Sequence, residues 1–349
     1  MQQLFRVRAA VAVISLASLV VLSGCLFDSA PEQPNSNATI PGGDNNPPPP
    51  PGDVGLGLGV DLTPHGPTLY TLPDNYWNLR VDSAPLDPNS ASIIATIKTY
   101  ESTGGRCHPD FGPNYGIPYC VVDGSTPKVA VSFNYASESD KGPYPIPVAA
   151  KTNSRYFENA GTFSNGNGGD MHILMLDRDS WILYELSYAN WNGSSWSAGA
   201  GAIFDLKTNG RRPDGWTSTS AGGLAVLAGL VRPDEAFGPD PIKHALRFSI
   251  KRTNGYVWPA SHSGASDAGA PPLGMRVRLK ASVDISGYPA PVRKIFQAMK
   301  TYGGILDDRG GNFYWQGVMD ARWDNNELNP AFHSLHADDF EVIKLGWKP

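Results

Sequence analysis

The chain has 349 residues and a formal net charge of −5, from 28 basic and 33 acidic side chains. No block of one sign stands out, which excludes nucleic acid as a partner, because such binding requires a concentrated basic surface. The sequence contains no nucleophile elbow, phosphate loop, dinucleotide fingerprint or zinc-protease helix, so we expect no cofactor and no metal.

The first 24 residues are predicted to be a signal peptide. A short basic region precedes an apolar run over residues 9–22, which is too short to span a membrane. The following box, Leu22-Ser23-Gly24-Cys25, resembles the processing site of bacterial lipoproteins. The resemblance implies cleavage before Cys25, diacylation of its thiol and a lipid anchor at the cell envelope. Leu26 follows, not Asp, which in a Gram-negative host favours the outer membrane.

Residues 25–65 are predicted to be a disordered tether. They are rich in Pro, Asn and Gly, including the run Pro47 to Pro51, and contain too few large apolar side chains to fold. Residues 66–349 have no second linker and no internal repeat, so we expect one globular domain there.

The domain is predicted to be mainly β. Alternating or β-rich segments lie at Lys128 to Tyr135, Met171 to Leu176, Trp181 to Tyr188, His244 to Ile250, Met275 to Val283 and Glu341 to Leu345. A clear helix is expected at Pro289 to Tyr302, capped by Gly303, and a weaker one at Ser220 to Leu230. This pattern favours a two-sheet β-sandwich or jelly-roll-like domain with one or two peripheral helices.

The strand at Met275 to Val283 has its apolar residues in alternate positions. This alternation places Arg276, Arg278 and Lys280 on the outward side. Such a basic row suits an anionic polysaccharide, although an ordinary solvent-facing strand has the same pattern.

The two cysteines left after lipidation, Cys107 and Cys120, are predicted to form a disulfide. They are an even pair in a chain that the signal sends to an oxidising compartment. A metal or redox site is the alternative, but it requires a shorter spacing between the thiols.

The most chemically loaded segment runs from Gly169 to Leu186. Two predicted strands meet at the turn Asp177-Arg178-Asp179-Ser180. If the two central residues of this turn form the loop, His172 stands opposite Glu185 on an otherwise apolar face. An imidazole beside a carboxylate suits general acid or base catalysis, because burial and a charged neighbour tune both pKa values. The alternative is a cross-strand ion pair that closes a sheet edge.

A polar turn from Arg212 to Ser218 is a second candidate. It would present Asp214 and the Trp216 ring to a sugar, or it is a salt-bridged turn with Trp216 in the core. The segment Cys107-His108-Pro109-Asp110 suits either the rim of such a site or plain surface, and we interpret Asp110 as a surface residue. The acidic and imidazole residues near the C-terminus fit no metal motif and indicate a solvated turn: His333, His336, Asp338 and Asp339.

Six motifs occur together and in order: Gly116-Ile117-Pro118-Tyr119, Gly142 to Pro147, Gly169 to His172, Leu183 to Leu186, Arg212 to Ser218, and His244 to Phe248. Over roughly residues 75 to 345 the chain therefore resembles a widespread family of secreted bacterial proteins that are usually left uncharacterised. The resemblance implies a secreted domain and no particular activity. The family pattern has an Arg and an acidic residue where this chain has Met171 and Ser220.

Two functions are consistent with these patterns. The first is an enzyme that cleaves a polysaccharide, either a hydrolase with two carboxylates roughly 5–9 Å apart, or a lyase that uses His172 or a Tyr as base. The second is a non-catalytic glycan-binding or structural surface lipoprotein. The predicted catalytic residues are His172, Glu185, Asp170 and Asp214, and the predicted substrate-binding residues are Trp181, Tyr184, Arg212, Trp216 and Arg247.

Overall fold

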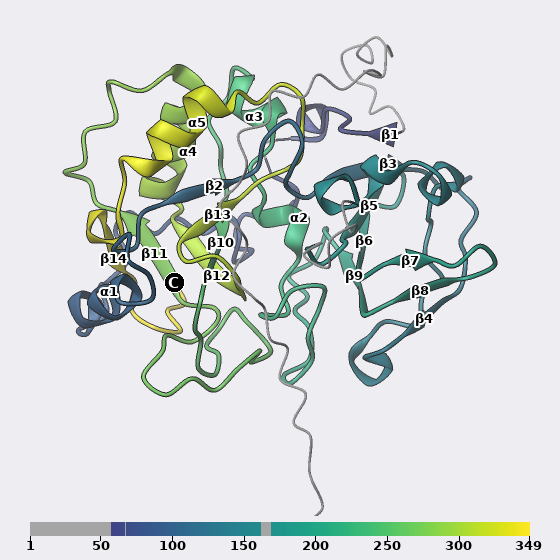
Figure 1. The fold of residues 1–349 in the computed structure, drawn as a ribbon, viewed down its shortest axis with the longest axis horizontal. Helices are drawn as coiled ribbons and strands as arrows, with labels where there is room; N and C mark the ends of the chain where they lie inside the picture. Colours follow the sequence, from purple (N-terminus) through teal and green to yellow (C-terminus); the bar gives the residue numbers. More distant parts are fainter. Residues whose placement is uncertain (1–56, 67, 162–168) are drawn as a thin grey trace, which may run out of the picture.

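The computed structural model describes residues 57–66, 68–161 and 169–349. Within them the chain is mainly β and sandwich-like, which confirms the fold class predicted from the sequence (Figure 1). A five-stranded sheet has the spatial order β1 (Gly57–Leu58), β3 (Tyr119–Val122), β5 (Ile173–Asp177), β6 (Ile182–Ser187) and β9 (Ala200–Asp205). A six-stranded sheet has the order β14 (Phe340–Val342), β11 (Arg276–Leu279), β12 (Gly304–Arg309), β10 (Leu246–Ile250), β13 (Tyr314–Gln316) and β2 (His108–Asp110). A small third sheet contains β4 (Val131–Phe133), β8 (Trp196–Ala198) and β7 (Asn190–Trp191).

The described residues form more helices than the sequence predicted. They are α1 (Ser90–Lys98), α2 (Val226–Gly229), α3 (Pro233–Phe237), α4 (Ala290–Thr301) and α5 (Asn325–His333). Six short 3-10 segments are η1 (Thr63–His65), η2 (Ala136–Glu138), η3 (Val148–Lys151), η4 (Ser154–Tyr156), η5 (Glu158–Gly161) and η6 (Ala337–Asp339). The helix α4 matches the prediction, because Val292, Ile295 and Met299 are buried on one side and Gly303 ends it with a φ of 70°.

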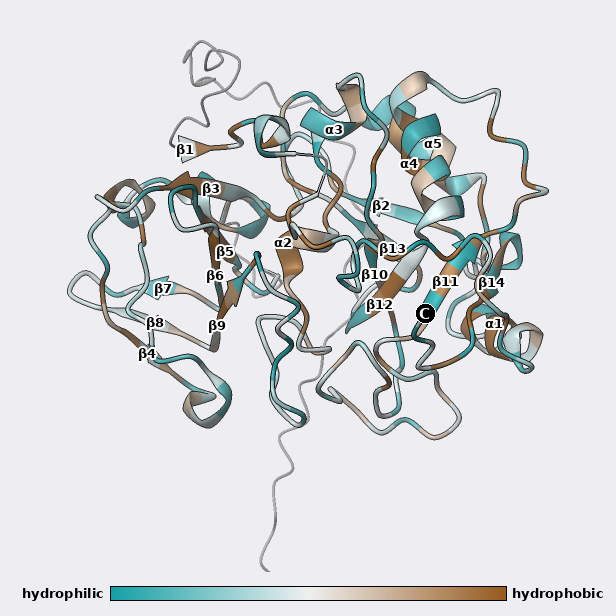
Figure 2. Cartoon of the chain, turned by 180° about the vertical axis from the view of Figure 1, so that it is seen from behind, coloured by the Kyte–Doolittle hydropathy of each residue, from teal (hydrophilic) through white to brown (hydrophobic). Residues whose placement is uncertain are grey.

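Three of the four hydrophobic clusters in the described residues separate the layers. One lies between the six-stranded sheet and helices α4 and α5, and another lies between the five-stranded sheet and the small third sheet. The third of these clusters lies between the two larger sheets and includes all of α2 except Gly229, so this helix is an internal element (Figure 1). In Figure 2 the ribbon of α2 is accordingly brown, whereas that of α3 is largely teal, because its buried residues include Asp234 and Glu235.

The hairpin of β5 and β6 differs from the predicted register by two residues. Asp177 pairs with Ile182, so the loop has four residues and Leu174, not His172, stands opposite Glu185. Side chains alternate along a strand, and a shift of two therefore keeps each of them on its predicted face. Leu174 accordingly packs between the two larger sheets, on the same side of the sheet as Glu185.

The tether ends earlier than predicted. Gly57 and Leu58 pair with β3. Leu62 is buried, and its amide donates to a carboxylate oxygen of Asp234 at 3.1 Å. Residues 57–65 thus belong to the fold and not to the predicted segment 25–65. The predicted signal peptide and Cys25 lie outside the described residues.

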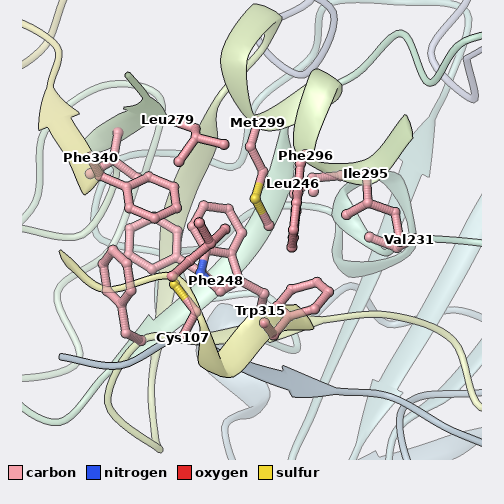
Figure 3. Close-up of a cluster of buried hydrophobic side chains, with 14 of the residues drawn as sticks. Cys107, Val231, Leu246, Phe248, Leu279, Ile295, Phe296, Met299, Trp315 and Phe340 are labelled. Carbon is pink, nitrogen blue, oxygen red and sulfur yellow. The ribbon is translucent and has the colours of Figure 1, made fainter. Parts of the chain in front are cut away.

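The predicted disulfide is wrong for this structure, because Cys107 and Cys120 are both free and buried. Cys107 lies against the Phe248 and Trp315 rings in the cluster under α4 (Figure 3), whereas Cys120 on β3 belongs to the cluster beside the small sheet. Two thiols in different layers of the fold cannot meet without moving strands. Burial raises the pKa of both, that of Cys120 to about 12.

Two members of the basic row, Arg276 and Arg278, are not directed to solvent as predicted, whereas Lys280 just after β11 is partly exposed. The Arg276 guanidinium is buried and donates to the carbonyl oxygens of Tyr76, Leu79 and Tyr302. Arg278 pairs with Glu341 at 2.6 Å. These side chains hold the segment that precedes α1 against the sheet, and an anionic polysaccharide has no access to Arg276.

Candidate functional site

Arg247 on β10 is the centre of a buried polar cluster. Its Nε donates to Asp307 Oδ2 at 2.9 Å, while its terminal nitrogens contact Asp308 and Gln316 Oε1. β10 and β12 run parallel with a bulge at Asp307, where the register shifts. The bulge explains why two successive residues both reach the same guanidinium, since a regular strand would direct them to opposite faces.

Helix α2 closes the inner side of this cluster. At Gly229 an added Cβ would lie 2.4 Å from the Trp77 ring and 2.9 Å from Arg247 Cβ. Only glycine therefore allows α2 to pack this closely against β10.

His172, just before β5, approaches the cluster from the other sheet. Its Nδ1 lies 2.8 Å from Glu158 Oε2, and its Nε2 lies 2.7 Å from the carbonyl oxygen of Thr219. Both neighbours are acceptors, so each ring nitrogen donates and the imidazole is a cation. Burial opposes that charge, but the Glu158 carboxylate outweighs it and raises the pKa of His172 to about 9. His172 thus holds and orients Glu158, and it has no nitrogen left to act as a base.

Glu185 lies on the same face of the five-stranded sheet as His172, and it is also fully buried. Its Oε2 accepts from Thr219 Oγ1 at 2.9 Å and from the Val226 amide at 3.1 Å, and its Oε1 accepts from the Leu227 amide at 3.0 Å. The carboxylate thereby satisfies the free amides at the start of α2. Both oxygens are occupied, so the predicted catalytic role of Glu185 is replaced by a structural one.

Three carboxylates form the half-buried rim of the cluster: Asp110 on β2, Glu158 on η5 and Asp170 ahead of β5. Gln316 stands beside Asp110 in the register of β13 and β2, and its Nε2 donates to Asp110 Oδ2 at 3.4 Å. The surface interpretation of Asp110 is therefore wrong. We call Arg247, Asp307, Asp308, His172, Gln316 and the three rim carboxylates the open cluster.

The rim carboxylates have opposite pKa shifts. Burial, together with the nearby charge of Glu158, raises the pKa of Asp110 to about 6. Burial also raises the pKa of Asp170. For Glu158 burial is outweighed by the charge and the hydrogen bond of His172, so its pKa is lowered. Burial raises the pKa of Asp308, below the rim, to about 7 in spite of Arg247. The open cluster thus combines an ionised carboxylate with proton-holding ones.

Strained backbone gathers at the same rim. Six non-glycine residues of the described chain have a left-handed φ, and four of them are Asn159, Ala160, Met171 and Tyr188. The first two follow Glu158, and Met171 separates Asp170 from His172. Such conformations cost free energy and are found preferentially at functional sites, so their concentration supports this location.

The remaining predicted site residues lie elsewhere. The buried Trp181 donates its Nε1 hydrogen to the Leu69 carbonyl, and Tyr184 faces the small sheet, where Lys128 contacts its hydroxyl.

In the turn from Arg212 to Ser218, Arg212 is buried against Asp140, and its guanidinium lies 5.2 Å from the centre of the Trp216 ring. Asp214 is exposed and pairs with Arg211. The predicted sugar-binding turn is therefore a salt-bridged turn, and Asp214 is absent from the open cluster. Arg247 belongs to the cluster, but it is buried beneath the rim and pairs with carboxylates.

The sequence analysis missed Glu158, Thr219, Asp307, Asp308 and Gln316. Glu158 lies in an irregular segment without periodicity. Its place at the site is set by contacts with His172, whose carbonyl oxygen accepts from the Glu158 amide at 3.1 Å and whose Nδ1 lies 2.8 Å from its carboxylate. The adjacent acids at 307 and 308 were the available signal, because two successive charges inside an apolar strand pattern are unusual. Ser220 donates to Asp307 Oδ1 at 2.8 Å.

The C-terminal His and Asp residues do not converge. His333 packs edge-on against His108 at 4.9 Å, while Asp338 pairs with Lys98 at the surface. Over the described ranges, no group of three or more His, Cys, Asp or Glu side chains is arranged to hold a metal ion.

No family model, curated protein or solved structure matches the chain. Among the described helices, none has the length and apolarity needed to cross a bilayer.

Proposed function

We propose that the chain is a lipid-anchored envelope protein that hydrolyses a polysaccharide at the open cluster. The observation that carries the proposal is the rim, where Glu158 is kept ionised by His172 while burial keeps a proton on Asp110 up to a pH of about 6. Glycoside hydrolysis requires this combination of one carboxylate and one carboxylic acid.

The roles follow from the contacts. Asp110 donates its proton to the oxygen of the leaving sugar, and within the described residues its carboxyl group has the long hydrogen bond from Gln316, at 3.4 Å. Glu158 acts on the anomeric centre, as a base towards water or as a nucleophile. Within the described residues, His172 reaches the Glu158 carboxylate through Oε2. Asp170 orients the sugar hydroxyl groups. Arg247 and His172 are positioning residues beneath them.

A hydrolase fits these contacts better than a lyase. A lyase needs a free base and a cation that neutralises a uronate. His172 has an acceptor at both nitrogens, and Arg247 is buried with its nitrogens on Asp307, Asp308 and Gln316.

A panel of neutral, acidic and amino-sugar polysaccharides tests the proposal, with new reducing ends as the readout. We expect at least one substrate to be cleaved by the intact protein. The variants Glu158→Gln and Asp110→Asn should each lose roughly 100-fold or more of that activity. Asp214→Asn is the matched control, because this exposed carboxylate lies outside the open cluster, and it should retain full activity.

Two other outcomes would contradict the proposal, one for the reaction and one for its site. Glycan binding without products would favour the non-catalytic binding protein. Equal activity of Glu158→Gln and the Asp214→Asn control would remove the open cluster as the site.

The lipid anchor is tested separately. Cys25→Ser should leave an unprocessed or soluble protein, as followed by fractionation and mass. A variant that stays in the membrane fraction with the mass of the wild type would contradict acylation at Cys25.

A further inference from the structure

Two exposed tyrosines flank one glycine at the end of the five-stranded sheet. Tyr188 directly follows β6 and Gly199 directly precedes β9, so they face each other next to the Ser187 and Ala200 pair. On the other side of Gly199, the Tyr135 amide donates to the Gly199 carbonyl at 2.9 Å. Tyr188 is 42% exposed and Tyr135 is 46% exposed. The three segments lie side by side, so the tyrosine backbones are separated by two strand spacings, about 10 Å.

The ring of Tyr188 is seated on the glycine. An added Cβ at Gly199 would lie 2.7 Å from Cδ2 of Tyr188, so only glycine allows this contact. The left-handed φ of 50° at Tyr188 directs the ring into this position at a cost in backbone strain. One side of the ring therefore rests on backbone while the residue as a whole stays exposed.

Tyr188 is also joined to the rim of the open cluster. Its hydroxyl donates to Asp170 Oδ1 at 2.7 Å, and its amide contacts the Asp170 carbonyl oxygen. An exposed aromatic ring thus extends directly from a rim carboxylate. Aromatic rings of this kind combine an apolar face with a polar tip, and they bind ligands that have both characters.

We propose that Tyr188 and Tyr135 form a sugar-stacking subsite that leads a glycan chain into the open cluster. The occupant is the part of the polysaccharide that lies next to the cleaved unit, and this assignment rests on the proposed function. The Tyr188 ring stacks on the apolar face of one sugar, while its hydroxyl fixes Asp170. Tyr135 supports a sugar further along the chain.

Three variants separate the two roles of Tyr188 from that of Tyr135. Tyr188→Phe keeps the ring and removes the bond to Asp170, so KM should stay within about 2-fold while kcat falls and its pH profile shifts. Tyr188→Ala removes the ring as well and should raise KM for long chains roughly 10-fold, as expected for one lost stacking contact. Tyr135→Ala should raise KM for long chains only and leave short oligosaccharides unaffected. Tyr256→Ala is the control, because this residue is 39% exposed but lies in a different segment.

Binding of the same glycans by Glu158→Gln separates this inference from the proposed function. Weaker binding after Tyr188→Ala in that background supports the subsite even if no product forms. If the wild type cleaves glycans and Tyr188→Ala leaves both KM and binding at the level of Tyr256→Ala, the subsite is wrong while the hydrolase stands. If neither cleavage nor binding of any glycan is observed, both proposals are overturned.

Discussion

The domain contains two buried ionic clusters with similar members and different surroundings. In the open cluster His172 lies between Glu158 and a backbone carbonyl. In the second, which we call the enclosed cluster, His244 lies between Glu235, at 3.1 Å, and the carbonyl oxygen of Ala245, at 2.8 Å. The enclosed cluster is completed by Arg232, which contacts both Glu235 and Asp234.

Exposure distinguishes the two clusters. Side chains of the enclosed cluster are at most 6% exposed, whereas Glu158 reaches 12% and lies beside the half-buried Asp110 and Asp170. In the enclosed cluster the Asp234 carboxylate binds the Leu62 amide, so its charge fastens the N-terminal segment. A buried ion network is thus not in itself a site. It becomes a candidate where carboxylates with opposite pKa shifts are partly exposed to solvent.

The largest effect is expected from Glu235→Gln. This change leaves the buried charge of Arg232 without part of its compensation, which should lower the free energy of unfolding by about 3 kcal/mol. Activity per folded molecule should stay unchanged, because the residue lies outside the open cluster. Urea unfolding together with an active-fraction assay measures both. A selective loss of activity at full stability would reverse the assignment of the two clusters.

Glu185→Gln should also act on stability. It replaces an acceptor of three hydrogen bonds by a group that accepts at one end only, which should cost about 2 kcal/mol. We expect glycan cleavage to persist below the shifted melting temperature. Complete loss of activity with an unchanged melting curve would restore Glu185 as a catalytic residue.

The titration of His172 is the next test. Its pKa, measured by NMR of the ring nitrogens, should lie near 9 in the wild type and should fall in Glu158→Gln. The folded value exceeds the usual 6.5, so the stability due to this proton is complete below pH 6.5 and is lost as the pH rises through about 9. A His172 that is neutral at pH 7 would contradict the ionic account of the open cluster.

The smallest effect concerns the thiols. Reductant should leave the melting temperature unchanged, because Cys107 and Cys120 are free in separate layers. Both should resist alkylation in the native protein and react after unfolding. A peptide that joins the two residues under non-reducing conditions would contradict the structure.

The faces of the strands could be predicted from the sequence better than their partners. Alternation placed His172 and Glu185 on one face, and a loop longer by two residues left that result intact while changing the residue opposite Glu185. The two do lie close together, but through Thr219, whose position depends on an irregular segment.

The rest of the site could not be predicted because it depends on contacts between distant segments. Glu158 is separated from the next β-strand by residues without periodicity, and Asp110 meets Gln316 only because β2 pairs with β13. The adjacent acids at 307 and 308 are unusual in an apolar strand, but that one of them forms a bulge depends on the pairing of β12 with β10. The predicted disulfide was wrong for the same reason, since a count of cysteines contains no information about which layer of the fold each one occupies.

The attachment of residues 57–62 has a mechanical consequence. A pull on the chain ahead of Gly57 reaches first the two residue pairs that join β1 to β3, and then the bond between the Leu62 amide and Asp234. None of these contacts includes a residue of the open cluster. With a lipid at Cys25, tension from the membrane would therefore be borne first by the pairing of β1 with β3 and then by the enclosed cluster, and Asp110 and Glu158 would keep their geometry while the anchor moves.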